Sequence, residues 1–418
     1  AIPPCMGAFL VIASNINNKD AGSSPWASRL LSLPPVVFLG KISYSLYLWH
    51  WPLIVFLKYV SIDEPTILQR LAIVTISIIL AWLSWRFVET PFRKKTTPGS
   101  HRKAFKTFGI ITAVFIALGA IIYKMDGLPS RFSTETLAYA MTGNQRKDFD
   151  DTVPTIIATN QLTLISPAQD DRKPLPILVW GDSHARSTIP LFRQLCEEYQ
   201  TNIYIAHQSG TPPMLGVISP PAVLDLTLNE SIFELIKKQQ IKHVILVARW
   251  ELHAVGDRKE HIPSTLRDPT APDKPAIQVF SAALKQTVST LRAAGINVWI
   301  MKQIPLQKVY PPRLLANAHR YGYSEDTYLK IIGIPVSTHL EWQKPFNQSI
   351  DALAALGAHV LDPLTLLTNG SGYCIMESDG HSLYYDDNHL SKYGALRLKP
   401  LFSPLFEKFV IPSANTQQ

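Results

Sequence analysis

Residues 181–184 of this 418-residue chain read Gly-Asp-Ser-His and carry the first group that could do nucleophilic chemistry. They follow an apolar run typical of a buried strand and precede an amphipathic stretch typical of a helix. Gly181 permits a sharp turn, so Ser183 would stand at a helix N-terminus, where N–H groups and the helix dipole favour a negative oxygen. A serine whose attack creates an oxyanion needs such a place. The alternative for Asp182 and Ser183 is plain helix N-capping.

The residues that could activate this serine come near the end of the chain. Residues 385–391 read Tyr-Asp-Asp-Asn-His-Leu-Ser, which places Asp386 and His389 three residues apart, ahead of the last predicted helix. A base and the carboxylate that orients it can reach a serine from one short loop at that spacing. Asp387 is the neighbour that could be mistaken for the orienting acid. Taken alone, the pattern also fits a helix-capping aspartate beside a surface histidine.

The scaffold that must position these groups is predicted by short apolar runs that alternate with amphipathic stretches from residue 175 onward. Five strands are expected, at residues 177–180, 203–206, 243–248, 298–302 and 359–361. Helices are expected at residues 189–199, 231–239, 277–294, 346–356 and 391–409. Strands separated by helices predict a parallel sheet covered on both faces. The reactive residues of such sheets lie beyond the carboxyl ends of the strands.

The first 125 residues differ, because they hold nearly all the long uncharged runs. Residues 30–57 carry Lys41 as their only charged residue, residues 66–85 carry only Arg70, and residues 107–123 carry none. A membrane-spanning helix needs ~20 apolar residues, so three spans are predicted, with the tail of a fourth at 1–13. Hydrophobic residues make up 46% of the chain and charged residues 17%, which together with these runs excludes a disordered chain and an entirely soluble one.

Basic residues in the short loops predict the orientation. Seven lysines and arginines stand against Glu89 alone in residues 86–106, so this loop is expected in the cytoplasm and the chain after residue 123 outside it. This loop explains the net charge of +8 better than nucleic-acid binding does, since no basic stripe with interleaved aromatic residues follows. The chain starts without a methionine, in an apolar run, and we expect it to be the C-terminal part of a longer protein.

Residues 126–174 between the two halves are polar and interrupted by prolines. They form either a loose tether or an extension that wraps the outer domain. The short apolar pieces at 153–159 and 162–165 favour the extension. The predicted domains are therefore 1–125, 126–174 and 175–412.

The sequence from about 175 to 410 resembles the SGNH (GDSL-like) family of hydrolases and acyltransferases, because Gly-Asp-Ser before a helix, five strands and a late Asp-x-x-His occur in that order. The resemblance implies a three-layer α/β/α fold. It implies Ser183 as the nucleophile, His389 as the general base and Asp386 as the acid that orients it. The backbone N–H groups of Ser183 and Gly210 would form the oxyanion hole; the alternative for Gly210 is a plain turn glycine.

The sequence departs from the family in its third block. The usual Gly-x-Asn-Asp after the third strand is Ala-Arg-Trp-Glu here, at residues 248–251. The asparagine that normally donates its amide is absent, so the third donor could be the indole N–H of Trp250, or Arg249. For Trp250 the alternative is core packing.

Two phrases in the membrane half, GKISYSLYLWHWPLIVF at 40–56 and RFVETPFR at 86–93, resemble the last core spans of the acyltransferase-3 family. The resemblance covers residues 1 to about 95. Those membrane enzymes pass an acyl group from a cytoplasmic thioester to an extracytoplasmic glycan. An ionisable group at membrane depth is a functional candidate, which singles out His50; the alternative is a satisfied polar group. The resemblance implies acetyl-CoA as donor to the full-length protein, through spans that precede this chain.

Three cysteines exclude a disulfide framework and a four-cysteine zinc site. Cys196 and Cys374 fall in the expected oxidising compartment, and the sequence leaves their pairing open. Cys5 is expected in the membrane and unpaired. No cluster has metal-ligand spacing, so neither a metal nor a bound cofactor is expected.

The two resemblances together imply a multi-pass O-acetyltransferase of the bacterial inner membrane, with its C-terminal domain in the periplasm. It would acetylate a surface polysaccharide such as lipopolysaccharide O-antigen, with the bilayer and a glycan acceptor as partners and no nucleic acid. Three alternatives stay open: a peptidoglycan O-acetyltransferase, a membrane-anchored carbohydrate acetyl esterase, and a tethered glycan-binding module with a decayed site.

Overall fold

The structure, a computed structural model, describes residues 6–7, 9–10, 12–13, 26–62, 64–91, 100–145, 154–156, 160–165, 174–220 and 227–409. The chain divides into two compact units, Ala1–Pro129 and Ser130–Gln418, and each is described by itself. The division falls inside the range that the sequence predicts as a linker.

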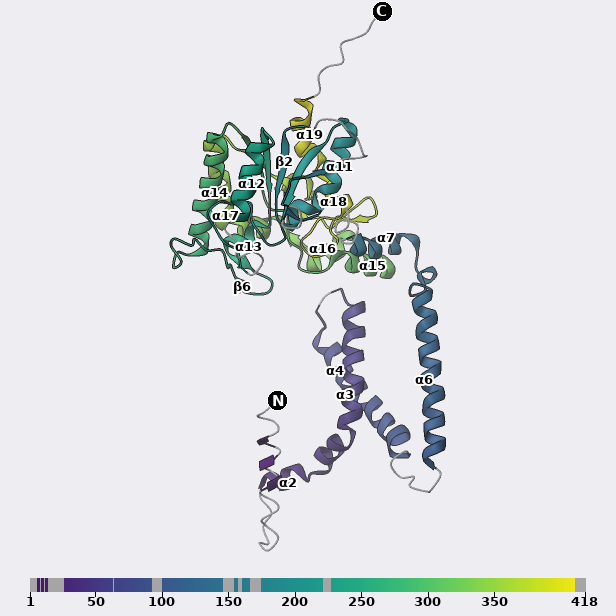
Figure 1. The fold of residues 1–418 in the computed structure, drawn as a ribbon. Coiled ribbons are helices and arrows are strands. Elements are labelled where there is room, and N and C mark those ends of the chain that lie inside the picture. The colour runs from purple at the N-terminus through teal and green to yellow at the C-terminus, as the bar shows by residue number, and fades with distance from the viewer. Residues whose placement is uncertain are drawn as a thin grey trace, which may run out of the picture. The chain divides into compact units, whose positions relative to one another are not determined.

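The first unit is helical where it is described (Figure 1). Its helices are α2 (Trp26–Leu31), α3 (Pro34–Val60), α4 (Ile67–Leu83), which continues into the π-helical turn η1 (Ser84–Glu89), and α6 (Ser100–Lys124). Helices α3 and α4 pack against each other. A capping box starts α4, because the Thr66 hydroxyl accepts the Gln69 N–H and the Gln69 side chain accepts the Thr66 N–H.

Two stretches of the described residues are long and apolar enough to cross a membrane, Ile67–Glu89 and Phe105–Lys124. They are not core helices of this unit. Only Ser77 and Ala81 are buried in α4, and no residue of the apolar window in Phe105–Lys124 is buried. Side chains this apolar and this exposed need an apolar solvent or further helices around them.

These two stretches correspond to two of the three predicted spans. The third, at 30–57, is the 27-residue helix α3, which is long enough but too rich in tyrosine, tryptophan and serine to reach the same hydropathy. Most of the predicted fourth span, including Cys5, lies outside the described residues, as does the centre of the basic loop at 92–99.

A six-stranded sheet forms the centre of the second unit, in the order β1-β3-β2-β4-β7-β9. Its strands are β1 (Thr163–Ile165), β2 (Ile177–Gly181), β3 (Ile203–His207), β4 (His243–Val247), β7 (Asn297–Met301) and β9 (His359–Leu361). The last five pair in parallel at the positions that the sequence predicts, whereas β1 pairs with β3 in the antiparallel direction. Strand β1 is an addition, because its short apolar piece does not by itself indicate a strand.

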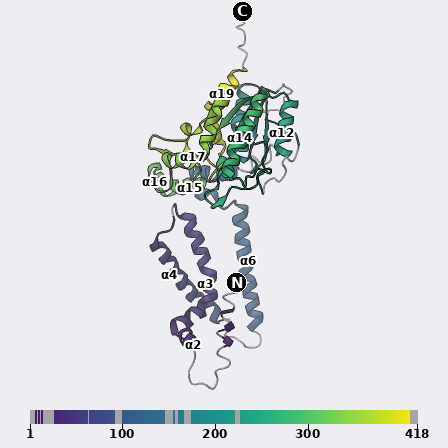
Figure 2. The ribbon, with the colours of Figure 1, turned by 90° about the vertical axis from the view of Figure 1, so that its left-hand side faces the viewer.

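Alternating side chains along β2 belong to two cores, one on each face of the sheet. Ile177 and Val179 pack with α11 (Ile189–Glu198), α18 (Lys392–Arg397) and α19 (Lys399–Glu407). Leu178 and Trp180 pack with α12 (Thr227–Lys238), α14 (Ala276–Ala293) and α17 (Val336–Asp351). Figure 1 shows the two sets of helices on opposite sides of the sheet, and Figure 2 looks at the side of α12, α14 and α17. The result is the expected three-layer arrangement.

Some helices differ from the prediction for local reasons. The predicted last helix at 391–409 is broken into α18 and α19, because Pro400 in the first turn of α19 has no N–H with which to continue α18. The predicted helix at 346–356 is the end of α17 followed by a 3-10 turn, η4 (Ala352–Leu356).

Further short elements fill the connections. The helices are α10 (Ser183–Ser187), α13 (Trp250–Ala254), α15 (Pro311–Tyr321) and α16 (Glu325–Ile332), and the short 3-10 turns are η2 (Pro129–Arg131), η3 (Gly143–Gln145) and η5 (Pro363–Leu366). Three two-stranded pairs join β5 (Gly256–Asp257) with β6 (Ile262–Pro263), β8 (Ile334–Pro335) with β10 (Tyr373–Cys374), and β11 (Glu377–Ser378) with β12 (His381–Ser382).

The described part of the predicted linker is folded onto the second unit. Helix α7 (Thr134–Thr142) packs on α15, where the Thr136 hydroxyl lies 2.9 Å from His319 Nδ1. Strand β1 extends the sheet at its edge. For these residues an extension of the outer domain is therefore the better description. The remaining linker residues, 146–153, 157–159 and 166–173, lie outside the described residues.

Cys196 in α11 and Cys374 in β10 are both buried and both free, so the bridge considered from the sequence is not formed. Burial raises the pKa of each thiol to about 12. The thiolate is the reactive form of cysteine, so both residues are chemically protected while the unit is folded.

We expect neither thiol to react with a disulfide reagent such as dithiobis(nitrobenzoate) in the native chain. In a Cys5→Ser background, two thiols should react once the chain is unfolded in denaturant without reductant. Cys374→Ser should lower that number to one. A requirement for reductant before the two thiols appear would show that they are bridged.

Candidate active site

Strand β2 ends at Gly181, where the chain turns into α10. A Cβ at Gly181 would lie 1.7 Å from the carbonyl oxygen of Val247 in β4, so glycine alone allows the two strands to approach this closely. Asp182 caps α10, because its carboxylate accepts the His184 N–H at 2.7 Å. The capping interpretation therefore holds for Asp182, and Ser183 makes a different contact.

Ser183 meets the loop that precedes α18, 206 positions further along the chain. His389 Nε2 lies 2.7 Å from Ser183 Oγ, and His389 Nδ1 lies 2.7 Å from Asp386 Oδ2. An ionised carboxylate only accepts hydrogen bonds, so Nδ1 carries the proton and Nε2 can accept the one on Ser183. The structure thus brings the three predicted residues together in the arrangement of nucleophile, base and orienting acid.

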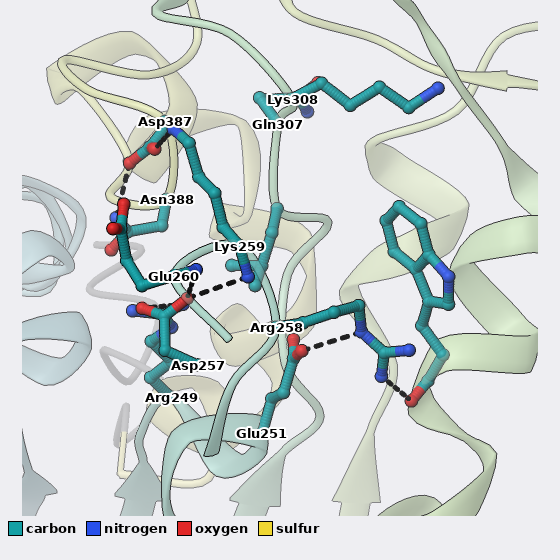
Figure 3. A pocket seen from close by; sticks show the side chains of 12 residues that line it. Arg249, Glu251, Asp257, Arg258, Lys259, Glu260, Gln307, Lys308, Asp387 and Asn388 are labelled. Atoms are coloured by element: carbon teal, nitrogen blue, oxygen red, sulfur yellow. Dashed lines mark hydrogen bonds and ion pairs between the residues drawn. The ribbon is translucent and has the colours of Figure 1, made fainter. Parts of the chain in front are cut away.

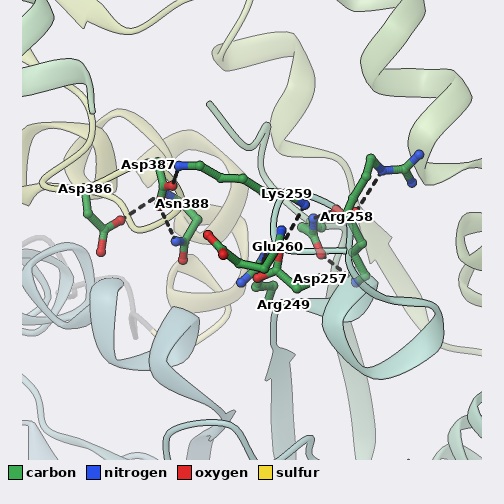
Figure 4. A network of polar contacts seen from close by, with 10 residues as sticks. Arg249, Asp257, Arg258, Lys259, Glu260, Asp386, Asp387 and Asn388 are labelled. Carbon is green, nitrogen blue, oxygen red and sulfur yellow. Dashed lines mark hydrogen bonds and ion pairs between the residues drawn. The ribbon is translucent and has the colours of Figure 1, made fainter. Parts of the chain in front are cut away.

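Asp386 also shapes the loop that holds the base. Its Oδ1 accepts the backbone N–H groups of Asn388 at 2.9 Å and His389 at 2.7 Å. The neighbouring Asp387 turns elsewhere: it pairs with Lys259 and accepts the Asn388 side-chain amide at 2.7 Å. Figure 4 shows Asp387 beside Lys259, whereas Asp386 is the aspartate that contacts the His389 ring, so the geometry distinguishes between them.

Burial and neighbouring groups change the pKa values of two residues beside the base, Asp386 and His184. Burial by itself would raise the pKa of Asp386, but the hydrogen bond and charge of His389 and two backbone N–H groups lower it below its ordinary value. Asp386 is therefore ionised at neutral pH. Burial lowers the pKa of His184 to about 3, and His389 contributes because the two ring centroids are only 4.8 Å apart. A neutral His184 adds no positive charge beside the base.

Asp182 has a second function that the sequence does not reveal. Its side chain is 1% exposed, and besides His184 it accepts the Arg249 N–H at 2.9 Å and contacts His253 Nε2 at 3.2 Å. Burial would raise the pKa of this carboxyl, yet the His253 hydrogen bond, the histidine charges and the Arg249 N–H lower it to about 2. The buried carboxylate joins the turn after β2 to the loop after β4. Its only signal in the sequence is its place beside Ser183.

The predicted oxyanion donors lie at one edge of the sheet. Ser183 is the first residue of α10, and Gly210, with a φ of +70°, lies in the loop after β3. Strands β2 and β3 pair with Gly181 opposite His207, so both loops leave the sheet at the same edge. The roles of the Ser183 and Gly210 N–H groups stay predictions.

The structure corrects the prediction that the indole N–H of Trp250 is the third donor of the oxyanion hole. Its indole N–H donates to the carbonyl oxygen of Met301 in β7 at 2.8 Å, and its ring is fully buried against Phe280. Trp250 is a core residue, and its only donor is already in use. The Arg249 guanidinium pairs with Asp257 at 3.0 Å, while its buried Nε contacts no hydrogen-bond acceptor among the described residues.

A cavity of about 490 Å³ borders the loop of the base. Its wall includes Asp387 and Asn388, which stand between Asp386 and His389 in the chain. The rest comes from residues between Arg249 and Glu260 after β4, from Leu306–Lys308 after β7, and from Trp342 of α17. Figure 3 shows the charged side chains of this wall, with Lys259 extended towards Asp387. The size is that of a small-molecule site.

His50 lies in the first unit and is described within it. Its Nδ1 is 2.8 Å from the carbonyl oxygen of Tyr47 and 3.1 Å from that of Leu46, so one ring nitrogen is satisfied by its own helix. A mostly apolar cavity of about 460 Å³ between α3 and α4 includes His50 in its wall. A catalytic role for His50 stays a prediction. Among the described residues, no three metal-ligating side chains gather into a site.

Two families match the chain. The SGNH domain family, in which the domain is fused to AT3 domains, matches residues 147–404, and the acyltransferase domain family matches residues 1–86. The O-acetyltransferase OatA of Staphylococcus aureus (strain NCTC 8325 / PS 47) is 44% identical over 70 residues, which are 16% of this chain and 11% of the relative. A Staphylococcus aureus (strain COL) protein provisionally named an O-acetyltransferase is 33% identical over 151 residues. That match covers 34% of this chain and 23% of the relative, so the chain spans less than a quarter of the length of either protein.

Two solved structures are similar in fold. The periplasmic domain of the lipopolysaccharide acetyltransferase of Salmonella ser. Paratyphi A is 16% identical, with 56% of this chain and 85% of that chain covered and a TM-score of 0.43. A GDSL-like lipase of Bacteroides thetaiotaomicron VPI-5482 is 10% identical, with 65% and 100% covered and a TM-score of 0.34.

Gly181→Ala should destabilise the second unit by ~3 kcal/mol or more, because the new Cβ meets backbone rather than a side chain that could move. Thermal unfolding of the detergent-solubilised chain, followed by tryptophan fluorescence, measures the effect. Gly370→Ala is the matched control, since nothing lies within 4 Å of its Cβ position, and its effect should stay within ~0.5 kcal/mol. Equal unfolding temperatures for the two variants would contradict the close approach of β2 and β4.

Asp182→Asn should lower the free energy of unfolding by about 2 kcal/mol at pH 7. This is the stabilisation that corresponds to a carboxyl pKa lowered from 3.8 to about 2 in the folded state. A depressed pKa stabilises the folded state above the ordinary pKa of the carboxyl, and the stabilisation is lost as the pH falls towards about 2. The difference between variant and parent should therefore shrink below pH 4. The exposed Asp273→Asn is the control. A difference that does not change with pH would mean that the charge of Asp182 is not what stabilises the fold.

Proposed function

The chain belongs to the family of SGNH domains fused to acyltransferase-3 domains, and from this premise we propose that it is an O-acetyltransferase that acts on a bacterial surface polysaccharide. The observation that carries the proposal is the contact of His389 with Ser183 on one side and Asp386 on the other, each at 2.7 Å. Lipopolysaccharide O-antigen is the proposed acceptor, and peptidoglycan is the alternative within the same chemistry.

The reaction proceeds in two displacements. In the first, Ser183 Oγ attacks the carbonyl carbon of an acetyl ester or thioester, and His389 Nε2 takes the hydroxyl proton. The tetrahedral intermediate collapses to acetyl-Ser183, and the leaving alcohol or thiol receives that proton. In the second, a sugar hydroxyl attacks the acetyl-serine and gives its proton to His389. The proton then returns to Ser183 Oγ as the acetylated sugar leaves.

The charges of the site support this cycle. Asp386 is ionised and holds the imidazole by Nδ1, so the imidazolium that forms in each displacement faces a carboxylate. The oxyanion would be held by the N–H groups of Ser183 and Gly210. With the Trp250 indole bound to Met301, these two backbone donors are the ones proposed.

We propose that the first unit is the part of the protein that takes up the acetyl group from its donor. The acyltransferase match at residues 1–86 and the two apolar stretches support a multi-pass protein of the inner membrane that takes acetyl from cytoplasmic acetyl-CoA. The second unit would then work in the periplasm, with the bilayer and a glycan acceptor as partners. His50 is the residue of this half proposed to take part.

A membrane-anchored carbohydrate acetyl esterase would use the same triad with water as acceptor. Such an esterase would also bind a sugar, so the match to SGNH domains fused to acyltransferase domains, rather than the cavity, is what supports transfer over hydrolysis. The non-enzymatic alternative, a glycan-binding module, does not account for a serine, a histidine and an aspartate held at these distances.

Ser183→Ala should abolish acetyl transfer, with a loss of ~10⁴-fold or more in kcat, while the unfolding temperature hardly changes. The substitution removes one oxygen from a helix start that carries little packing. The assay supplies an activated acetyl ester to the full chain and follows both acetyl-serine, by mass spectrometry, and acetylated sugar. Ser371→Ala, at an exposed turn, is the matched control. Wild-type rates of acetyl transfer in Ser183→Ala would remove the proposed nucleophile.

A further inference from the structure

The cavity of about 490 Å³ borders the loop that carries the base. Its walls follow the carboxyl ends of β4 and β7, and β4 is the neighbour of β2, after which Ser183 begins α10. Side chains of Asp387 and Asn388 enter its wall from the same loop that holds His389. The cavity therefore shares this loop with the base, although His389 is not one of the residues of its wall.

The charges of this wall cancel in pairs. Arg249 pairs with Asp257 at 3.0 Å, Arg258 pairs with Glu251 at 3.0 Å, and Lys259 pairs with Asp387. Figure 3 shows all three pairs in the wall of the cavity. The remaining two charged residues of the wall, Lys308 and Glu260, are exposed and opposite in sign. The cavity thus presents four cations and four anions, and no net charge.

The carboxylates of these pairs are held in place from more than one side. Asp257 accepts the backbone N–H groups of Lys259 at 2.9 Å and Glu260 at 3.0 Å besides its contact with Arg249. Asp387 accepts the Asn388 amide besides its contact with Lys259. Both carboxylates therefore have donors besides their cations. An anionic ligand would therefore enter a cavity in which three of the four cations are already paired with carboxylates.

The same wall suits a neutral ligand rich in hydroxyl groups. Arg249 lines the cavity, and its buried Nε is a donor without an acceptor among the described residues. Trp342 adds an apolar surface: its ring is half-buried, with the Arg258 guanidinium 5.2 Å from the ring centroid and an Arg258 N–H bonded to its carbonyl oxygen at 3.1 Å. A sugar ring combines hydroxyl groups at its edge with C–H groups on its faces.

We propose that this cavity binds an uncharged sugar unit of the acceptor and directs one of its hydroxyl groups at His389. The proposal rests on the proposed transferase function for its purpose, but binding can be measured without turnover. Trp342 is the residue proposed to hold the ring, and the three ion pairs are proposed to exclude sugars that bear a carboxylate or a phosphate.

The test measures binding to the full Ser183→Ala chain in detergent, so that no turnover interferes. The probes are the methyl glycosides of glucose, galactose, mannose and rhamnose, with methyl glucuronide, methyl galacturonide and glucose 6-phosphate as charged counterparts. Saturation-transfer NMR titrations give the affinities. We expect at least one neutral glycoside to bind, ~10-fold more tightly than its charged counterpart, with an affinity that does not change with salt.

A second substitution locates the binding. Trp342→Ala in the same background should weaken the neutral glycoside ~10-fold, whereas Tyr323→Ala, which removes an exposed aromatic ring outside the cavity, should not. Tighter binding of the charged sugars, no binding of any neutral glycoside, or equal affinities in the two variants would each overturn the proposal. Failure of the chain with Ser183 intact to form acetyl-serine from an activated ester would count against the transferase function instead.

Discussion

One buried charge organises the second unit. The Asp182 carboxylate lies between the nucleophile turn and the loop after β4, and a charge buried to this degree is tolerated only where donors surround it. Its three partners are the His184 N–H, the Arg249 N–H and His253 Nε2. Because two of these are backbone groups, satisfying the charge fixes where the main chain runs. The same carboxylate therefore fixes the backbone beside Ser183 and the backbone at Arg249, which lines the cavity.

Asp386 and Asp387, adjacent in the loop before α18, make contacts in two different directions. Asp386 turns inward, fixes the imidazole of His389 and accepts two backbone N–H groups of its own loop. Asp387 turns outward to Lys259, and its carbonyl oxygen accepts the Gln307 N–H at 2.7 Å. Asp386 therefore orients the base, and Asp387 joins the loop of the base to Lys259 and Gln307 of the cavity wall. Catalysis and acceptor binding, as proposed, share a single short loop.

The two units of the chain bury their apolar residues in different ways. The second unit has two cores, one on each face of its sheet, and strand β2 is buried throughout. The described helices of the first unit leave most of their apolar side chains exposed, as in Phe105–Lys124. That contrast is already visible in the uneven distribution of charged residues along the sequence. It is the physical reason why the two units can be distinguished from the sequence.

The strands and the turn at Gly181 were predictable from the sequence because strand periodicity and turn residues are local signals. The three residues that meet at the site were predicted from the resemblance to the SGNH family, since each motif taken alone also fits helix capping. The contacts between distant parts of the chain, by contrast, became visible in the folded structure. It directed the Trp250 indole to Met301, left Cys196 and Cys374 apart, and added β1 to the edge. It also buried Asp182 on the Arg249 N–H and paired Lys259 with Asp387. These partners lie tens to more than a hundred positions apart, and no local pattern records which of several equivalent donors a folded chain brings within 3 Å.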